Sequence, residues 1–185
     1  MPKPKILVVY FSRTGITRQV AKVLALELRA DIAEIKTSRY KPGRLGFFQA
    51  LWDSTLSKAV PIDNRLPDAS KYDVVVIGTP VWSSSISSPV RTYLDKVGYS
   101  PARVAFFLTH KVQMPQRIFR EMEHITGKSP ITTLAVSIGA LRGKLTEERV
   151  ASFVEDITKS FEPRRYTSHL RNKTNSATLR SDRHV

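Results

Sequence analysis

A cluster of hydroxyl side chains around a glycine follows the first apolar segment of the chain. It reads Ser12-Arg13-Thr14-Gly15-Ile16-Thr17 and stands directly before a stretch with helical spacing. The unpaired N–H groups of a first helical turn attract anions, and short hydroxyl side chains donate to phosphate oxygens. Gly15 lets the backbone approach a ligand closely. The pattern favours a phosphate site, and the alternative is an ordinary Ser/Thr-capped helix start.

A second polar segment, from Gly78 to Ser88, follows another buried apolar run and contains Trp82 among five serines. A flat heteroaromatic ring can lie against an indole while loop amides and hydroxyls bind its polar edge. The alternative is that Trp82 packs against a neighbouring helix and that the serines only solvate a loop. By itself this segment slightly favours the packed tryptophan and the solvated serines.

A third segment, Thr109-His110-Lys111, follows the next apolar run. His110 can hydrogen-bond a ring or a substrate carbonyl, and Lys111 can attract an anionic ring by its charge. A neutral surface histidine and a solvated lysine are the alternatives for these two side chains.

Several other kinds of site are excluded by the motifs. No G-x-G-x-x-G occurs, and Gly127-Lys128-Ser129 is not a Walker A loop, because Met122 stands where that motif needs a glycine. Ser83–Ser85 lack a nucleophile-elbow pattern, so nothing indicates a hydrolytic triad.

No metal site is predicted. The chain has no cysteine, and three histidines have no ligand partner at a metal-binding spacing: His124, His169 and His184. Glu121 and Glu123 are interpreted as a solvated helix surface.

The elements that must position these segments alternate regularly. Continuous apolar runs predict five strands, at 5–11, 31–35, 72–78, 102–109 and 131–138. Apolar residues at helical spacing predict helices from Ile16 to Leu28 and from about Pro115 to Thr126, with Gly127 at the end. Ser88 and Pro89 predict the start of another helix that stops at Gly98, and Thr146 is expected to cap the last. The alternation indicates a doubly wound α/β sheet.

Two segments do not fit this alternation. Tyr40–Pro61 contains an aromatic cluster with Phe47, Phe48 and Trp52, which predicts either a short helix at one edge of a site or a core under a long crossover. The same cluster leaves a homodimer contact open. The polar residues after Phe161 predict an extension that is flexible or wrapped on the surface. We therefore expect a domain at 1–161 and a basic extension at 162–185.

Composition and charge bound the class of protein. The 185 residues carry a net charge of +14 and are 41% apolar, which fits one globular domain. The extension holds six basic and two acidic side chains, so 24 basic and 14 acidic ones, a net charge of +10, remain elsewhere. Such a field attracts anions without choosing among them. No run reaches the length of a membrane-spanning helix, no signal peptide is indicated, and the absence of cysteine fits the cytoplasm.

The first two segments together resemble the flavodoxin-like family of FMN-binding proteins. The matching residues run from Ile6 through Thr17 and from Val76 through Arg91, with Gly127-Lys128-Ser129-Pro130 before the last strand. The resemblance spans about residues 5–160. It implies a three-layer sandwich with a five-stranded parallel sheet of order 2-1-3-4-5 and helices on both faces.

The resemblance also implies which residues hold FMN. The first loop would hold the phosphate without requiring a basic side chain, so that Arg13 contributes its amide and its guanidinium either points to solvent or stacks on the phosphate. The second loop would line the isoalloxazine ring, and the third would complete the site. The expected contact residues are Ser12, Arg13, Thr14, Gly15, Ile16, Thr17, Thr79, Pro80, Val81, Trp82, Ser83, Thr109 and His110. The third loop departs from the quinone-reductase pattern, since bulk and charge replace glycines there.

Three functions follow from the resemblance. The first is an FMN-dependent oxidoreductase that passes electrons from NAD(P)H or a protein donor to a quinone-like or other small acceptor, with no obligatory catalytic side chain. The second is a flavodoxin-type electron carrier that docks on a redox partner, although a charge of +14 either argues against a typical carrier or demands an acidic partner. The third is a flavin-free binding module whose basic extension contacts nucleic acid or an anionic membrane surface. Of these, the third and its nucleic-acid contact have the least support.

Overall fold

The structure is a computed structural model that describes residues 3–40, 43–56, 58–97, 103–111, 115–140 and 143–162. Residues 163–185, which make up nearly all of the expected C-terminal extension, lie outside the described residues, as does the expected helix stop at Gly98. Within the described part, none of the helices has the length and apolar character that crossing a membrane requires.

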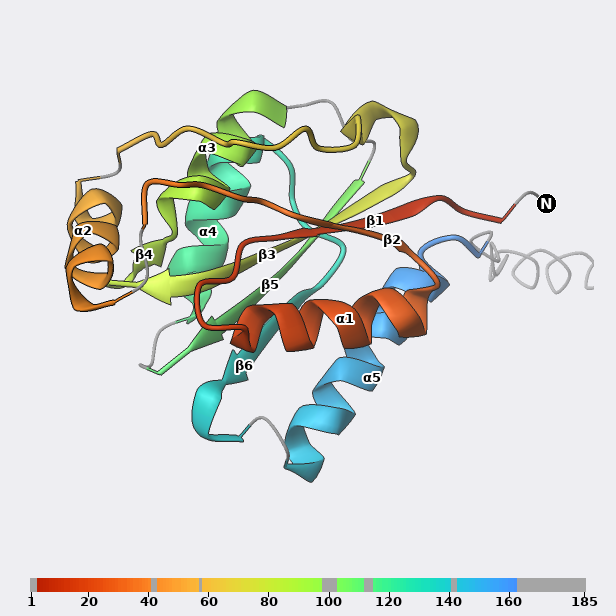
Figure 1. Cartoon of the computed structure of the whole chain (residues 1–185). Helices are drawn as coiled ribbons and strands as arrows, with labels where there is room; N and C mark the ends of the chain where they lie inside the picture. The colour runs from red at the N-terminus through yellow and green to blue at the C-terminus, as the bar shows by residue number, and fades with distance from the viewer. Residues whose placement is uncertain are drawn as a thin grey trace, which may run out of the picture.

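A parallel sheet forms the centre of the molecule (Figure 1). Its five parallel strands lie in the order β2-β1-β3-β5-β6, which is the expected order 2-1-3-4-5 for five strands counted along the chain. A sixth, two-residue strand, β4, pairs antiparallel with the end of β3. The strand bounds are β1 Ile6–Tyr10, β2 Asp31–Glu34, β3 Val74–Trp82, β4 Ser85–Ile86, β5 Arg103–His110 and β6 Thr133–Ser137.

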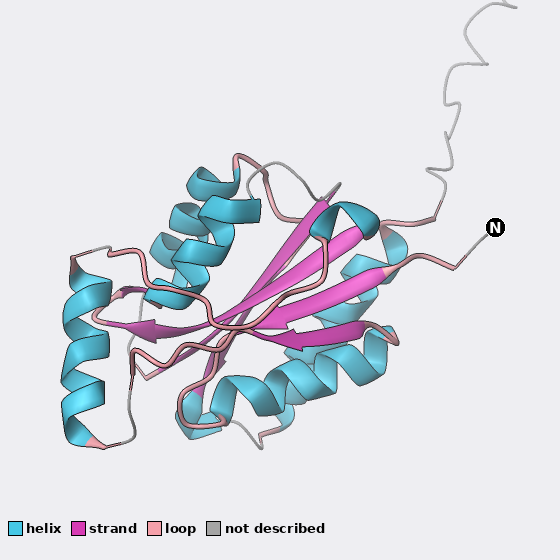
Figure 2. Ribbon diagram, turned by 45° about the horizontal axis from the view of Figure 1, so that its top comes forward, coloured by secondary structure: helices cyan, strands magenta, loops and turns pink. Residues whose placement is uncertain are grey.

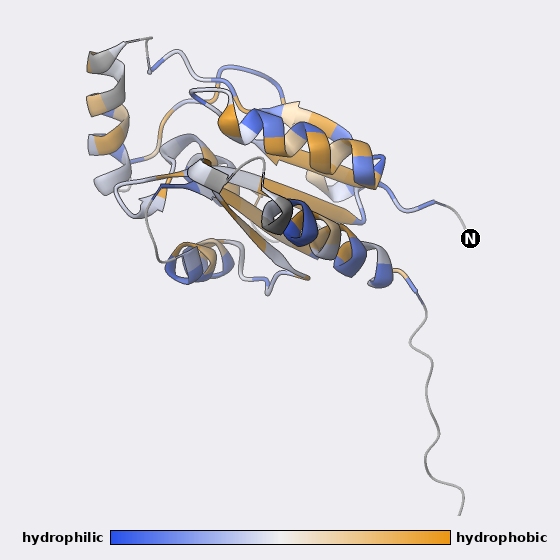
Figure 3. Ribbon diagram, turned by 90° about the horizontal axis from the view of Figure 1, so that it is seen from below, coloured by the Kyte–Doolittle hydropathy of each residue, from blue (hydrophilic) through white to orange (hydrophobic). Residues whose placement is uncertain are grey.

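Helices cover both faces of the sheet and give the expected three layers (Figure 2). Helices α1 and α5 pack on one face, where their apolar side chains join one core cluster, and α3 and α4 pack on the other face with a second cluster. The helix bounds are α1 Ile16–Leu28, α2 Arg44–Thr55, α3 Ser88–Val97, α4 Pro115–Thr126 and α5 Lys144–Lys159, with short 3-10 helices at Ala69–Lys71 and Ile138–Ala140. Figure 3 shows the apolar strands enclosed between helices of mixed polarity.

The central strands are apolar on both sides because both of their faces are covered. All five residues of β1 are buried. Gly78 in β3 leaves room for its neighbour, since a Cβ at this position would overlap the Phe107 ring of β5. The close approach of these two strands therefore requires a glycine at position 78.

Two boundaries differ from the sequence expectation. Helix α5 begins at Lys144, not at a Thr146 cap, because Gly143 holds an extended cap conformation and its carbonyl accepts from the backbone N–H of Thr146 at 2.8 Å. The segment expected to be a polar loop after Gly78 is also partly regular, since β3 continues to Trp82 and turns back into β4.

The first of the two segments that did not fit the expected alternation, Tyr40–Pro61, contains helix α2. This helix stands at the end of the sheet where β3 ends (Figure 1) and contacts β3, β4 and α3. Leu51 packs against the core, whereas three apolar side chains with helical spacing are exposed: Leu45, Phe48 and Trp52. The alternative that the aromatic cluster buries itself in the core is therefore wrong for Phe48 and Trp52.

Candidate functional site

Strand register brings the three expected loops to one edge of the sheet. Tyr10 pairs with Gly78 on the neighbouring strand, and Pro80 pairs with Thr109 on the next. The backbone N–H of Phe11 donates to the carbonyl of Gly78 at 3.2 Å, which joins the start of the first loop to the second. Because the carboxyl ends of parallel strands form the ligand edge of such folds, this is where the site is expected.

The first loop presents backbone N–H groups at the start of α1. Gly15 is the N-cap residue with φ +87°, a left-handed conformation that favours glycine, and its N–H donates to the Ser12 hydroxyl at 3.1 Å. Among the described residues no side chain caps the helix, and its first turn holds no acid. A Cβ built on Gly15 would meet no atom within 4 Å. The loop therefore has open space and partial positive charge at its mouth.

Arg13 contacts the crossover, which is the segment 35–73 between β2 and β3. Its guanidinium donates to the carbonyl of Gly43, the residue just before α2, at 2.7 Å. The exposed hydroxyl of this loop is that of Thr14, whereas Ser12 and Thr17 are buried.

The Thr17 side chain joins the first loop to the third. Its hydroxyl lies 2.8 Å from the hydroxyl of Thr109, and both groups are buried. The contact spans 92 positions of sequence and aligns the start of α1 with the end of β5. The structure thus brings together two residues that were expected to share one site.

The second loop is held from inside by Thr79. The buried Thr79 hydroxyl accepts from the backbone N–H of Ser87 at 3.1 Å and lies 3.1 Å from the Ser87 hydroxyl. Between them β3 and β4 form a hairpin whose two turn residues, Ser83 and Ser84, have φ of 46° and 58°. Residues other than Gly and Asn rarely adopt this backbone conformation, so the turn is strained at the expected ring site.

Trp82 is buried by two aromatic rings. Its exposed fraction is 8%, and it meets Phe11 and Tyr40 edge to face with ring centroids 5.5 and 5.6 Å apart. The two rings come from segments outside the helices, because Phe11 follows β1 and Tyr40 lies between β2 and α2. Only a small part of the indole remains available to a ligand.

The crossover carries an ion pair that the sequence analysis missed. Arg39 donates to Asp53 of α2 through Nε at 2.6 Å and through Nη2 at 3.1 Å, and the Tyr40 hydroxyl also donates to this carboxylate at 3.3 Å. The hydrogen bonds from Arg39 lower the pKa of Asp53, whereas burial raises the pKa of Tyr40. The cluster fixes Tyr40, and through it Trp82, against α2.

A second ion pair fixes the hairpin from the other side. The Arg91 guanidinium of α3 contacts the Glu121 carboxylate of α4, and the Ser85 hydroxyl donates to the same carboxylate at 3.2 Å. The interpretation of Glu121 as solvated surface is therefore wrong, because its carboxylate joins α3, α4 and β4. No sequence motif predicts this role of Glu121, since its partners Arg91 and Ser85 lie 30 and 36 positions away in the sequence.

The third loop is described only in part. His110 is half-buried at the end of β5, paired with Ser137, and Lys111 is exposed, while residues 112–114 lie outside the described residues. In the described part of the chain, no group of three or more His, Asp or Glu side chains is arranged to hold a metal ion.

Comparison with known proteins identifies the family. The family model described as Flavodoxin matches residues 5–157, which is most of the chain. The chain belongs to the flavodoxin family. Among curated proteins none matches it.

Solved structures show the same fold at low sequence identity. A flavoprotein from Lactobacillus acidophilus NCFM, solved in complex with FMN, is 22% identical with a TM-score of 0.62, covering 71% of this chain and 93% of its own. The oxidised flavodoxin 2 from Bacillus cereus is 16% identical with a TM-score of 0.57, covering 85% and 99%. The rubredoxin oxygen:oxidoreductase from Desulfovibrio gigas has the same identity and TM-score, covering 85% of this chain and 36% of its own. This flavodoxin-family chain thus has a fold found both alone and within a longer protein.

Proposed function

We propose that this flavodoxin-family chain binds FMN at the carboxyl edge of its sheet, with the phosphate at the first loop. The observation that carries the proposal is the start of α1, where a left-handed Gly15 leaves open space in front of N–H groups without a side-chain cap. The flavoprotein from Lactobacillus acidophilus that shares this fold was solved with FMN, which supports the same cofactor here.

The residues of the first loop fit a phosphate without a cationic partner. Thr14 is exposed and can donate to the phosphate, while the hydroxyls of Ser12 and Thr17 stand behind it. The amides of Arg13 and Ile16 supply further donors, while the N–H of Gly15 donates to Ser12 and the Arg13 guanidinium to Gly43. A dianion at a helix start needs no side-chain charge, because backbone dipoles favour it.

The ring of FMN would lie along the second and third loops. Pro80 and Val81 are half-buried and Ser83 is exposed, so their surfaces face the ring, while the buried Thr79 and Trp82 support the loop from below. Thr109 and His110 would close the site from β5. When bound, FMN supplies the redox chemistry, and these side chains orient the ring and exclude water from one side of it.

The reaction that we propose is electron transfer from NAD(P)H or a protein donor to a quinone-like or other small acceptor. No side chain is assigned as a catalytic residue, since positioning the cofactor is sufficient for this class of reaction. The protein's role is to hold the ring with one edge open to the second substrate.

A carrier function is the second candidate, and α2 favours it. Trp52 is 65% exposed beside the hairpin, and with Leu45 and Phe48 it forms an apolar surface at the same end of the sheet. Such a surface suits a docked redox protein or a second copy of the chain. The charge of +14 would require the docked protein to be acidic.

One set of measurements separates these functions. The purified protein should show the absorption bands of bound flavin, and NAD(P)H with a quinone should be consumed without any other protein. Reduction only through a separate reductase would assign the carrier function. A colourless protein whose melting temperature does not rise with added FMN would refute the cofactor proposal and favour a flavin-free binding module.

The phosphate site has its own test. Thr14→Asp places a carboxylate against the phosphate and should weaken FMN binding by a factor of at least about 100, as expected for like charges in a partly desolvated site. Thr14→Ser, which keeps the hydroxyl, is the matched control. Unchanged FMN content in Thr14→Asp would contradict the phosphate site.

A further inference from the structure

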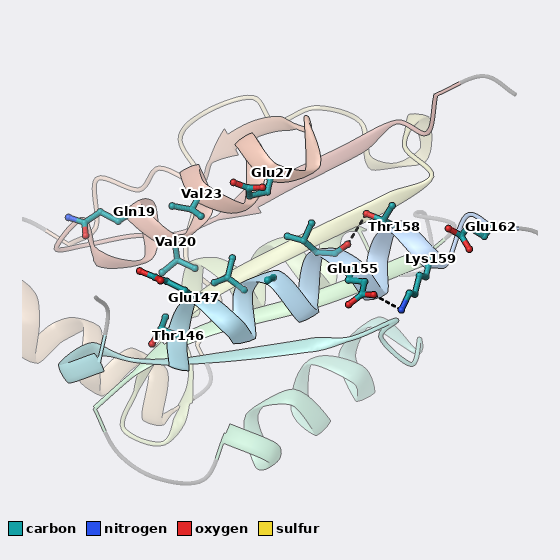
Figure 4. Close-up of a pocket in the computed structure, with 13 residues that line it drawn as sticks. Gln19, Val20, Val23, Glu27, Thr146, Glu147, Glu155, Thr158, Lys159 and Glu162 are labelled. Atoms are coloured by element: carbon teal, nitrogen blue, oxygen red, sulfur yellow. Dashed lines mark hydrogen bonds and ion pairs between the residues drawn. The ribbon is translucent and has the colours of Figure 1, made fainter. Parts of the chain in front are cut away.

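A groove runs between α1 and α5, on the sheet face opposite α3 and α4 (Figure 4). Its volume is about 880 Å³, and its floor is apolar. The floor residues come from both helices and are Val20, Val23, Val150, Ala151 and Val154. Val23 keeps 46% of its surface exposed. The two helices therefore leave an apolar surface between them that their own side chains do not fill.

The rim of this groove has the opposite charge to the chain as a whole. Four glutamates line it, and they are Glu27, Glu147, Glu155 and Glu162. The lysine among the lining residues, Lys159, lies 2.5 Å from the Glu155 carboxylate and is paired with it. In a chain with a net charge of +14, a rim with a net charge of −3 marks a surface suited to a basic ligand.

The chain supplies a basic segment at the end of this groove. Glu162 is both a lining residue and the last residue described. Pro163 follows it in the sequence, so the part of the chain outside the described residues begins at one end of the groove. Residues 164–173, the basic segment, carry four basic side chains and no acid: Arg164, Arg165, Arg171 and Lys173.

The basic segment also carries two apolar side chains at a useful spacing. Tyr166 and Leu170 are four residues apart, so they share a face whether the segment is helical or extended. Ten extended residues reach about 33 Å, which exceeds the roughly 24 Å length of the 16-residue helix α5. The segment can therefore reach along the whole groove.

We propose that the basic segment docks in the groove of its own chain. Tyr166 and Leu170 lie on the valine floor, and the arginines and Lys173 pair with the glutamate rim. The apolar contacts hold the segment, and the charges set its position and make docking sensitive to salt. Docking joins the C-terminal extension to the face of the molecule away from α2.

The absence of cysteine from the full chain makes a direct test available. The double variant Val23→Cys with Leu170→Cys places one thiol on the groove floor and one in the basic segment. The matched control is Leu26→Cys with Leu170→Cys, because Leu26 lies on the same helix, does not line the groove and is more exposed, at 75%. The rate of disulfide formation under a mild oxidant is followed on a non-reducing gel.

Docking predicts that the Val23 pair closes at least ten times faster than the Leu26 pair and that the product is a monomer. Random collision of the segment predicts equal rates or a faster Leu26 pair, and this result would overturn the proposal. A product that is mainly disulfide-linked dimer would overturn it as well, since the segment would then occupy the groove of a second copy.

Trypsin digestion gives a second readout that needs no cysteine. In low salt, cleavage after Arg171 and Lys173 should be at least five times slower in the unmodified chain than in the variant Glu27→Lys with Glu147→Lys. At 0.5 M salt, which screens the charges, the difference between the two cleavage rates should become smaller. Equal cleavage rates at low salt would contradict docking of the basic segment.

Discussion

The loop after β1 and the loop after β3 meet at the same edge of the sheet, yet they are held in different ways. The turn of the first loop is closed locally, since the N–H of Gly15 donates to the hydroxyl of Ser12 three residues earlier, and Arg13 and Thr17 add contacts with distant residues. The second is held by side chains far away in the sequence, since Tyr40 contacts Trp82 and Glu121 contacts Ser85. A local contact therefore closes the turn at the proposed phosphate end of the site, whereas distant side chains hold the proposed ring end.

The largest effect on the two loops is expected from a substitution of Gly78, because the carbonyl of this residue joins both loops. In Gly78→Ala the added Cβ would overlap the Phe107 ring, so we expect a loss of roughly 3 kcal/mol in the free energy of unfolding. Urea denaturation measures it. Gly139→Ala is the control, because its Cβ meets nothing within 4 Å and should change stability little. An equal, small effect for both variants would show that β3 and β5 do not need this glycine.

The second loop can be disturbed alone through the ion pair behind Tyr40. Because hydrogen bonds from Arg39 lower the pKa of Asp53, the folded state gains stability from this carboxylate above its unfolded pKa near 4 and loses it as the pH falls through the lower folded pKa. Asp53→Asn should therefore reduce the melting temperature by several degrees at pH 7, and the difference from the unmodified chain should shrink below about pH 4.

Asp95→Asn, at an exposed position of α3, serves as the control for this pH series. It should leave the melting temperature unchanged at every pH. A melting difference for Asp53→Asn that stays constant down to pH 2 would contradict a role for the charged carboxylate.

The smallest expected effect concerns the strain in the hairpin turn. Ser84→Gly should stabilise the protein by up to about 1 kcal/mol, because glycine adopts a φ of 58° without steric cost. Ser85→Gly, one residue further on, should destabilise it instead, since Ser85 has no positive φ and loses its hydrogen bond to Glu121. Urea denaturation of both variants measures these changes in the free energy of unfolding. Destabilisation by Ser84→Gly would show that the turn is not strained at this residue.

The sequence predicted the parts of this molecule that depend on local pattern. Buried apolar runs located the five parallel strands, and the resemblance to the flavodoxin family supplied their order. The start of α1 was predicted for the same reason, because Gly15 and its neighbouring hydroxyls lie within six residues. Residues 5–157 match the family as expected from these segments.

The parts that the sequence did not predict depend on distant contacts. Nothing in the segment around Trp82 indicates that Tyr40 and Phe11 cover the indole, since these contacts form only when β1 and the crossover are in place. The turn at Ser83 and Ser84 was missed because turns of this type usually contain Asn or Gly. Helix α5 has Gly143 as its N-cap and starts at Lys144, not after the more typical cap Thr146, because a glycine can also take the extended conformation of a helix cap.

The measurement that tests the central claim most directly compares the affinities of this protein for FMN and for riboflavin, which lacks the phosphate. If the first loop holds the phosphate, FMN should bind at least about 100 times more tightly than riboflavin, a difference of about 2.7 kcal/mol. In Thr14→Asp this ratio should fall to near one or below. Equal affinities for the two ligands in the unmodified chain would contradict the account.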